Sequence, residues 1–188
     1  MVSPRTLYFL AAAAFLLIFL ALTAGRYYLR ARRSYQVTWE SLLERLTFVD
    51  RHAIAEIALD VVNPSGGQRR DENSAILGSS EIWKLIGGWD GIEALEANCA
   101  VLIDLAFYVQ QWYPEKALVV AEQLRLSARE IEWHVQRLKA AEEAGKLETS
   151  ILMNAQRAAV TYFLMTRHVL SLYEQGNLPM LPDLQQSL

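Results

Sequence analysis

The sequence predicts an all-α protein in which an N-terminal single transmembrane helix is followed by an antiparallel bundle of about four long helices. Two observations predict this fold class. The chain opens with 19 residues that carry no charged side chain, from Leu7 to Gly25. The remainder places apolar residues at alternating spacings of three and four, which is typical of helices that pack against one another. We find no segment with the two-residue alternation of a half-buried strand.

The uncharged run is long enough to cross a lipid bilayer as a helix. At about 1.5 Å per residue it covers roughly 28 Å, close to the ~30 Å hydrocarbon thickness of a bilayer. A cleaved signal peptide is the alternative, with Thr23-Ala24-Gly25 as its cleavage site, but the apolar core of such a peptide has only ~7–15 residues. We therefore expect residues 1–33 to form an uncleaved membrane anchor with a basic flank.

The charges around this run predict its orientation. Arg5 precedes it, whereas four arginines follow it within eight residues: Arg26, Arg30, Arg32 and Arg33. Positive side chains beside a membrane span are retained on the cytoplasmic side. The sequence thus predicts an inner-membrane protein with the N-terminus outside, a cytoplasmic C-terminal domain and the lipid bilayer as one partner.

The rest of the chain is acidic. Residues 34–188 contain 13 basic and 21 acidic side chains, a net charge of −8. Nucleic-acid binding requires clustered Lys and Arg, so we expect no nucleic-acid partner. The single cysteine, Cys99, excludes an intramolecular disulfide and agrees with a reducing compartment.

Residues 34–177 are expected to form one helical bundle. The apolar spacing predicts long helices over about 38–62, 90–113, 114–144 and 147–175, and a short helix over 80–86. Turn signals separate them: an Asn-Pro-Ser-Gly-Gly run at 63–67, Gly87-Gly88, Pro114 and Gly145. We expect a flexible loop at about 63–79 and a proline-broken tail at 178–188.

The second long helix is apolar around most of its circumference, which is typical of a central bundle helix or of one that meets a partner. Two expectations concern the histidines. Across an antiparallel turn at Gly145, His134 should lie level with Arg157 and too far from His168 to share a metal ion with it. Each histidine, His52 included, is expected at the surface or at its boundary.

No motif with catalytic chemistry is present. The chain lacks the Glu-x-x-His pairs of a di-iron bundle and the spacings of zinc sites and of covalent haem attachment. The glycine-rich stretches at 66–69 and 87–91 lack the Lys-Ser/Thr ending of a phosphate-binding loop. We therefore expect no enzyme activity, no metal and no cofactor.

Asp104 and four large aromatic residues are the candidate interaction or buried polar residues. Asp104 lies away from the core-facing positions of its helix. It is therefore either a desolvated carboxylate or a surface aspartate that is exposed or paired with an arginine. Large aromatic side chains are common in cores and at binding hot spots. The four are Trp83, Trp89, Tyr108 and Trp112.

These features predict a membrane-anchored interaction or scaffold module, or an accessory subunit of a larger membrane complex, without catalytic activity. Its partner would be another protein or a further copy of the same chain in a homo-oligomer. The alternative is a small-molecule sensor or a cofactor-binding bundle. Its ligand would lie near Asp104, Cys99, Tyr108 and Tyr162.

Overall fold

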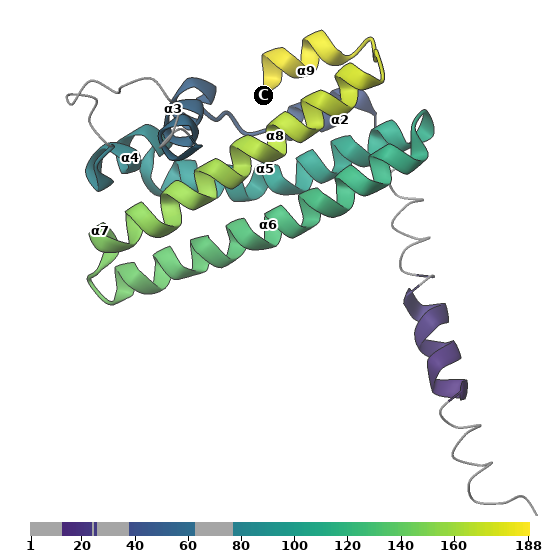
Figure 1. Cartoon of the computed structure of the whole chain (residues 1–188), viewed down its shortest axis with the longest axis horizontal. Coiled ribbons are helices and arrows are strands. Elements are labelled where there is room, and N and C mark those ends of the chain that lie inside the picture. The colour runs from purple at the N-terminus through teal and green to yellow at the C-terminus, as the bar shows by residue number, and fades with distance from the viewer. Residues whose placement is uncertain (1–12, 24, 26–37, 63–76) are drawn as a thin grey trace, which may run out of the picture. The chain divides into compact units, whose positions relative to one another are not determined.

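The structure is a computed structural model of the 188-residue chain and describes residues 13–23, 25, 38–62 and 77–188. The chain divides into two units, Met1–Val37 and Thr38–Leu188. The second unit is a bundle of helices (Figure 1). The described residues contain no strand, so the predictions of an all-α fold and of a helical bundle are confirmed.

The first unit contradicts the membrane prediction. Residues 13–23 are helical and expose apolar side chains such as Phe15 and Leu22. Throughout the described part of the chain, no helix combines the length and the apolar character that a membrane crossing requires. This finding overturns the predicted single-pass location in the inner membrane and the topology that went with it.

Much of the expected anchor, residues 1–33, lies outside the described residues. These are residues 1–12, 24 and 26–33, among them the flanking arginines Arg26, Arg30, Arg32 and Arg33. The expected flexible loop at 63–79 is likewise described only from Leu77 onward. Leu77 is buried, and a helix begins at Ser79.

The first long helix of the bundle is two helices instead of one. They are α2 (Trp39–Glu44) and α3 (Arg51–Val62). Between them, the N–H of Thr47 donates to Asn98 Oδ1 at 2.8 Å, and the C=O of Thr47 accepts from Asn98 Nδ2 at 2.7 Å. A distant side chain therefore satisfies both backbone groups of Thr47, which a continuous helix would have paired internally. The predicted single helix over 38–62 is wrong for this reason.

The next two helices begin close to their predicted positions. α4 (Ser79–Ile86) ends at Gly87, whose φ of 91° suits glycine, and α5 (Gly88–Tyr108) follows directly. Gly91 lies where α5 contacts the end of α4. A Cβ atom there would lie 1.7 Å from the carbonyl oxygen of Ile86, so only glycine permits this approach.

α6 (Pro114–Glu143) is the longest helix, and it starts at a proline in its first turn as predicted. Gly145, with a φ of 65°, then reverses the chain. The predicted fourth helix is interrupted: α7 (Leu147–Ser150) leads into a π-helical segment (Ile151–Ala155) before α8 (Gln156–Gln175). The expected proline-broken tail instead contains α9 (Leu181–Ser187), whose proline falls in the first turn, where it is tolerated.

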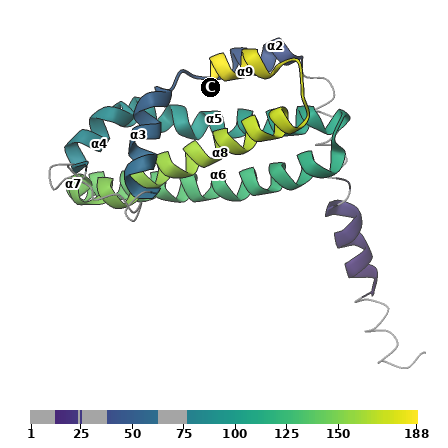
Figure 2. The same cartoon turned by 45° about the horizontal axis from the view of Figure 1, so that its top comes forward.

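The bundle is built on α5, α6 and α8, which run side by side in both views (Figures 1 and 2). α5 buries residues around most of its circumference and contacts α2, α4, α6 and α8, which confirms the central position predicted for it. α3 packs against α8, and α9 also contacts α8. The core therefore rests on three long helices, with α3 in place of a fourth.

Candidate functional site

Asp104 is paired with an arginine at the surface. Its Oδ2 lies 2.9 Å from Nη2 of Arg45, and the two side chains keep 37% and 46% of their surface exposed. Of the two interpretations that the sequence left open, the structure places Asp104 in the arginine-paired one. The pair joins the end of α2 to α5, and it offers no desolvated carboxylate to a ligand.

The aromatic candidates form two clusters. Trp83 and Trp89 meet edge to face with ring centroids 5.4 Å apart, and the Trp89 indole N–H donates to Glu142 at 2.7 Å. In the second cluster, Tyr108 contacts Trp112 at 5.5 Å and Trp39 at 5.7 Å. Each cluster joins helices within the domain: the first links α4 and α5 to α6, and the second links α2 to α5. Trp112 keeps about half its surface exposed.

The side chains of Cys99 and Tyr162 are buried, with 5% and 3% of their surface exposed. Burial, with a smaller contribution from the charge of Glu96, raises the pKa of the Cys99 thiol to about 12. Burial also raises the pKa of Tyr162 to about 12, against the opposing effect of a hydrogen bond from Asn98. A thiol with so high a pKa is a poor nucleophile and a poor metal ligand at neutral pH.

The structure reveals a groove that the sequence interpretation did not include, between the outer faces of α6 and α8. We call it the α6–α8 groove. It contains two hollows, of about 490 and 520 Å³. The first is lined by Glu115, Lys116, Val119, Val120, Gln123, His168, Ser171, Leu172 and Gln175. The second is lined by Glu130, Trp133, His134, Arg137, Met153, Asn154 and Arg157.

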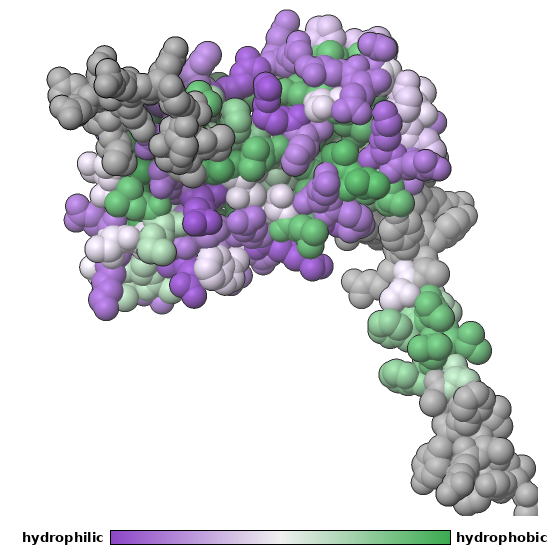
Figure 3. Space-filling view, viewed as in Figure 1, coloured by the Kyte–Doolittle hydropathy of each residue, from purple (hydrophilic) through white to green (hydrophobic). Residues whose placement is uncertain are grey.

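Three apolar residues of α6 are exposed, and two of them, Val119 and Trp133, each line one of the hollows. Val119, Leu126 and Trp133 keep 59%, 65% and 49% of their surface exposed. Their seven-residue spacing is two helical turns, or about 10.5 Å, so they lie in one line on one face of α6. We call them the apolar stripe. Figure 3 shows hydrophobic surface over α6 and α8 among hydrophilic side chains.

The sequence of α6 contains a second seven-residue repeat, at Val119, Leu126 and Trp133, and this repeat could have predicted the stripe. The sequence interpretation instead followed the repeat that faces the core, which the structure buries at positions such as Leu124 and Ile131. One repeat lies on the face of α6 that packs into the core. The other lies on the opposite face, where its side chains are exposed.

One end of the groove is organised by His134, which is buried with 4% of its surface exposed. Its Nδ1 lies 2.9 Å from Oδ1 of Asn154, a residue of the π-helical segment. The Asn154 amide N–H groups donate to the backbone oxygen and hydroxyl of Ser150, so the amide oxygen faces the histidine. This arrangement requires His134 to carry its proton on Nδ1 when neutral. π-helical segments often occur at functional sites.

The predicted neighbourhood of His134 is confirmed, since it lines the same hollow as Arg157, while His168 lines the hollow at the other end. Its expected surface position is wrong. The burial depends on the π-helical segment, which brings Asn154 against the ring. The other two histidines, His52 and His168, are exposed.

The two ends of the groove differ in charge. Arg137 stacks on the Trp133 ring, 4.3 Å from its centroid, and Arg157 lines the same hollow. Neither arginine has an ion-pair partner among the residues that the structure describes. The opposite end contains Glu115 and Lys116, and the lysine donates to Gln175 at 3.4 Å.

No family model matches the chain, and comparisons with curated proteins and with solved structures find no match either. Within the described ranges, no three His, Cys, Asp or Glu side chains are grouped in a way that could hold a metal ion. The α6–α8 groove is therefore the candidate site that the described residues support best.

Proposed function

We propose that this protein is a helical interaction module that binds a second copy of itself through the exposed face of α6 beside the α6–α8 groove and acts by binding rather than by catalysis. The observation that carries the proposal is the apolar stripe on α6. A line of exposed apolar side chains at seven-residue spacing is the pattern by which one helix packs against another. Aligned apolar residues left open to water are typical of an interaction surface.

The stripe is symmetric about Leu126, which favours a two-fold arrangement. Val119 and Trp133 each lie seven residues from Leu126. If α6 packs antiparallel to α6 of the partner, Leu126 meets Leu126 on the two-fold axis and each Val119 meets a Trp133. A small side chain then faces a large one on both sides of the axis. Such self-complementary contacts are the rule in symmetric dimers.

Charge supports the same arrangement. Glu115 and Arg137 each lie eleven residues from Leu126, so the antiparallel dimer places each glutamate opposite an arginine that has no ion-pair partner among the described residues of its own chain. Glu122 and Glu130 also face one another across the axis. Their repulsion is reduced because Glu122 is ion-paired with Arg125.

The first test is the mass of the full chain by analytical ultracentrifugation over a range of concentrations. We expect the wild-type chain to dimerise. Leu126→Glu should shift it to the monomer, because two carboxylates would meet at the two-fold axis. Leu59→Glu is the matched control, since Leu59 is similarly exposed but lies on α3. A wild-type chain that stays monomeric at every concentration would overturn the proposal.

Disulfide trapping tests the register. Leu126→Cys should form a disulfide with its own copy, because position 126 lies on the axis. Val119→Cys should not do so alone, but should form one when mixed with Trp133→Cys. Cys99 is buried and does not compete. Equal trapping at all three positions would contradict the proposed register.

Charge reversal tests the same dimer independently. Glu115→Arg and Arg137→Glu should each weaken dimerisation severalfold, and the double variant should recover most of the loss because it restores opposite charges with the polarity exchanged. A double variant that is weaker than either single variant would show that these two residues do not face each other.

A further inference from the structure

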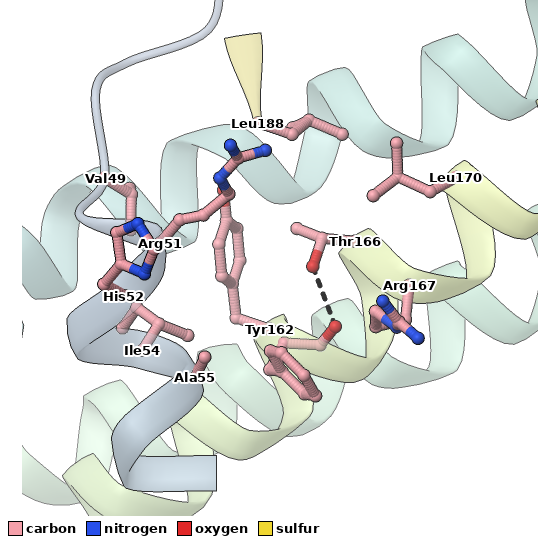
Figure 4. A pocket seen from close by; sticks show the side chains of 11 residues that line it. Val49, Arg51, His52, Ile54, Ala55, Tyr162, Thr166, Arg167, Leu170 and Leu188 are labelled. Carbon is pink, nitrogen blue, oxygen red and sulfur yellow. Dashed lines mark hydrogen bonds between the residues drawn. The ribbon is translucent and has the colours of Figure 1, made fainter. Parts of the chain in front are cut away.

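A separate cavity, of about 300 Å³, lies between α3, α8 and Leu188 (Figure 4). Its volume is at the lower end of the range for small-molecule sites. The α3 side contributes Val49, Arg51, His52, Ile54 and Ala55, and the α8 side contributes Tyr162, Phe163, Thr166, Arg167 and Leu170, with Leu188 completing the wall. None of these residues lines the α6–α8 groove.

The walls of this cavity are held in place by hydrogen bonds. The Asp50 carboxylate accepts from the backbone N–H of His52 at 2.9 Å and of Ala53 at 3.1 Å, which fixes the start of α3. The Arg51 guanidinium donates to the backbone oxygen of Gln185 and so connects α3 to α9. The walls of the cavity are therefore fixed by the fold.

The lining combines positive charge with apolar surface. Arg51 and Arg167 carry its positive charge, His52 adds an imidazole, and no Asp or Glu side chain is part of the lining. Neither arginine has an ion-pair partner among the described residues. Figure 4 shows Arg51 and His52 on the α3 side and Arg167 on the α8 side. The apolar residues are Val49, Ile54, Ala55, Phe163, Leu170 and Leu188.

The Thr166 hydroxyl donates its proton to the backbone oxygen of Phe163 at 2.8 Å. Arg51 and Arg167 are the groups of the lining that carry a permanent positive charge for the charged end of a ligand.

We infer that this cavity binds a small organic anion with a short apolar chain, of which a medium-chain carboxylate is the simplest example. Guanidinium groups bind carboxylates through two parallel charge-assisted hydrogen bonds. The apolar walls remove the chain from water. The inference does not depend on the proposed dimer, because the cavity and the groove share no residue.

The test is a calorimetric titration of the full chain with octanoate. We expect saturable binding of octanoate, weaker binding of octanol and none of octyltrimethylammonium. Arg167→Gln should weaken octanoate binding about tenfold or more, the effect of losing one hydrogen bond to a charged group. Arg129→Gln, an exposed arginine of α6 outside the cavity, is the matched control and should bind like wild type.

Ala55→Phe is a second variant, because its ring would fill the cavity and should prevent octanoate from binding. Thermal unfolding shows whether this variant has folded. The inference is overturned if octanoate fails to bind at millimolar concentration, if octanol binds equally well, or if Arg167→Gln leaves the affinity unchanged. Leu126→Glu should bind octanoate like wild type, so failure of the dimer and failure of this site are distinguishable.

Discussion

The side-chain amide of Asn98 bonds both the backbone N–H and the backbone C=O of Thr47, 51 residues away in the chain. Asn98 is almost fully buried, and its amide also donates to the Tyr162 hydroxyl at 3.1 Å. One side chain on α5 thereby fixes the segment between α2 and α3 and links it to α8. The cavity beside α3 depends on the chain direction that this contact sets.

We expect Asn98→Ala to destabilise the domain strongly. It removes two part-buried hydrogen bonds to the backbone of Thr47 and a buried one to the Tyr162 hydroxyl, at about 0.5–1.5 kcal/mol each, so the loss should be roughly 2–4 kcal/mol. Urea denaturation measures it. Gln136→Ala, an exposed position on α6, is the control and should change stability by less than about 0.5 kcal/mol. A loss below about 1 kcal/mol for Asn98→Ala would mean that water replaces the amide.

Gly91 should not tolerate a methyl group. In Gly91→Ala the added Cβ would lie 1.7 Å from the Ile86 carbonyl oxygen, so α4 and α5 would have to separate. We expect a loss of several kcal/mol or failure to fold. Gly78→Ala is the matched control, because that glycine has an ordinary φ of −75° and no atom within 4 Å of the new Cβ. Similar melting temperatures for the two variants would contradict this account of the helix junction.

Stability should fall as the pH rises above about 9. The folded state raises the pKa of Cys99 from 9 to about 12 and that of Tyr162 from 10 to about 12. The unfolded chain therefore releases these protons first. The stability they contribute is fully present below pH 9 and is lost progressively between pH 9 and pH 12.

Cys99→Ala should remove the earliest part of this loss, about 1 kcal/mol by pH 10. The measurement is urea denaturation of both chains at pH 8, 9 and 10. Comparing how the free energy of unfolding changes with pH in each chain cancels the pH-independent effect of the smaller side chain. The surface groups that titrate in this range are the same in both chains. Parallel curves would show that the thiol is not desolvated.

Asp104→Asn should cost at most about 1 kcal/mol, because the Arg45–Asp104 pair is partly exposed to solvent. Thermal unfolding of Asp104→Asn, Arg45→Gln and the double variant measures the coupling between the two residues. A coupling energy well above about 1 kcal/mol would contradict the partly exposed ion pair and restore the interpretation of Asp104 as a desolvated carboxylate.

Most of the helical framework could be predicted from the sequence. The apolar repeats of α5 and α6 fixed which face each helix buries, since a period of 3.6 residues leaves few alternatives. Gly87, Pro114 and Gly145 marked three boundaries through backbone preferences that act locally. Prediction failed where a distant residue replaced local hydrogen bonds. Asn98 bonds the backbone of Thr47 and so interrupts the helix predicted over 38–62, and no property of residues 45–50 alone predicts that contact.

The candidate sites were less predictable than the fold. Asp104 and the aromatic residues were predicted from their residue types. In the structure Asp104 forms an ion pair, and the aromatic residues make contacts between helices. The apolar stripe was present in the sequence as a second repeat, but a repeat does not show which of two apolar faces the rest of the chain covers. The cavity beside α3 combines residues more than 100 positions apart.

The sequence by itself thus determined the helical class, the buried faces of the long helices and the turns between them, because each depends on residues within a few positions of one another. Tertiary structure decided the break between α2 and α3, the burial of His134 by Asn154, the uncovered face of α6 and the cationic cavity. These features depend on which surfaces the folded chain leaves covered or open, and that follows from packing rather than from local pattern.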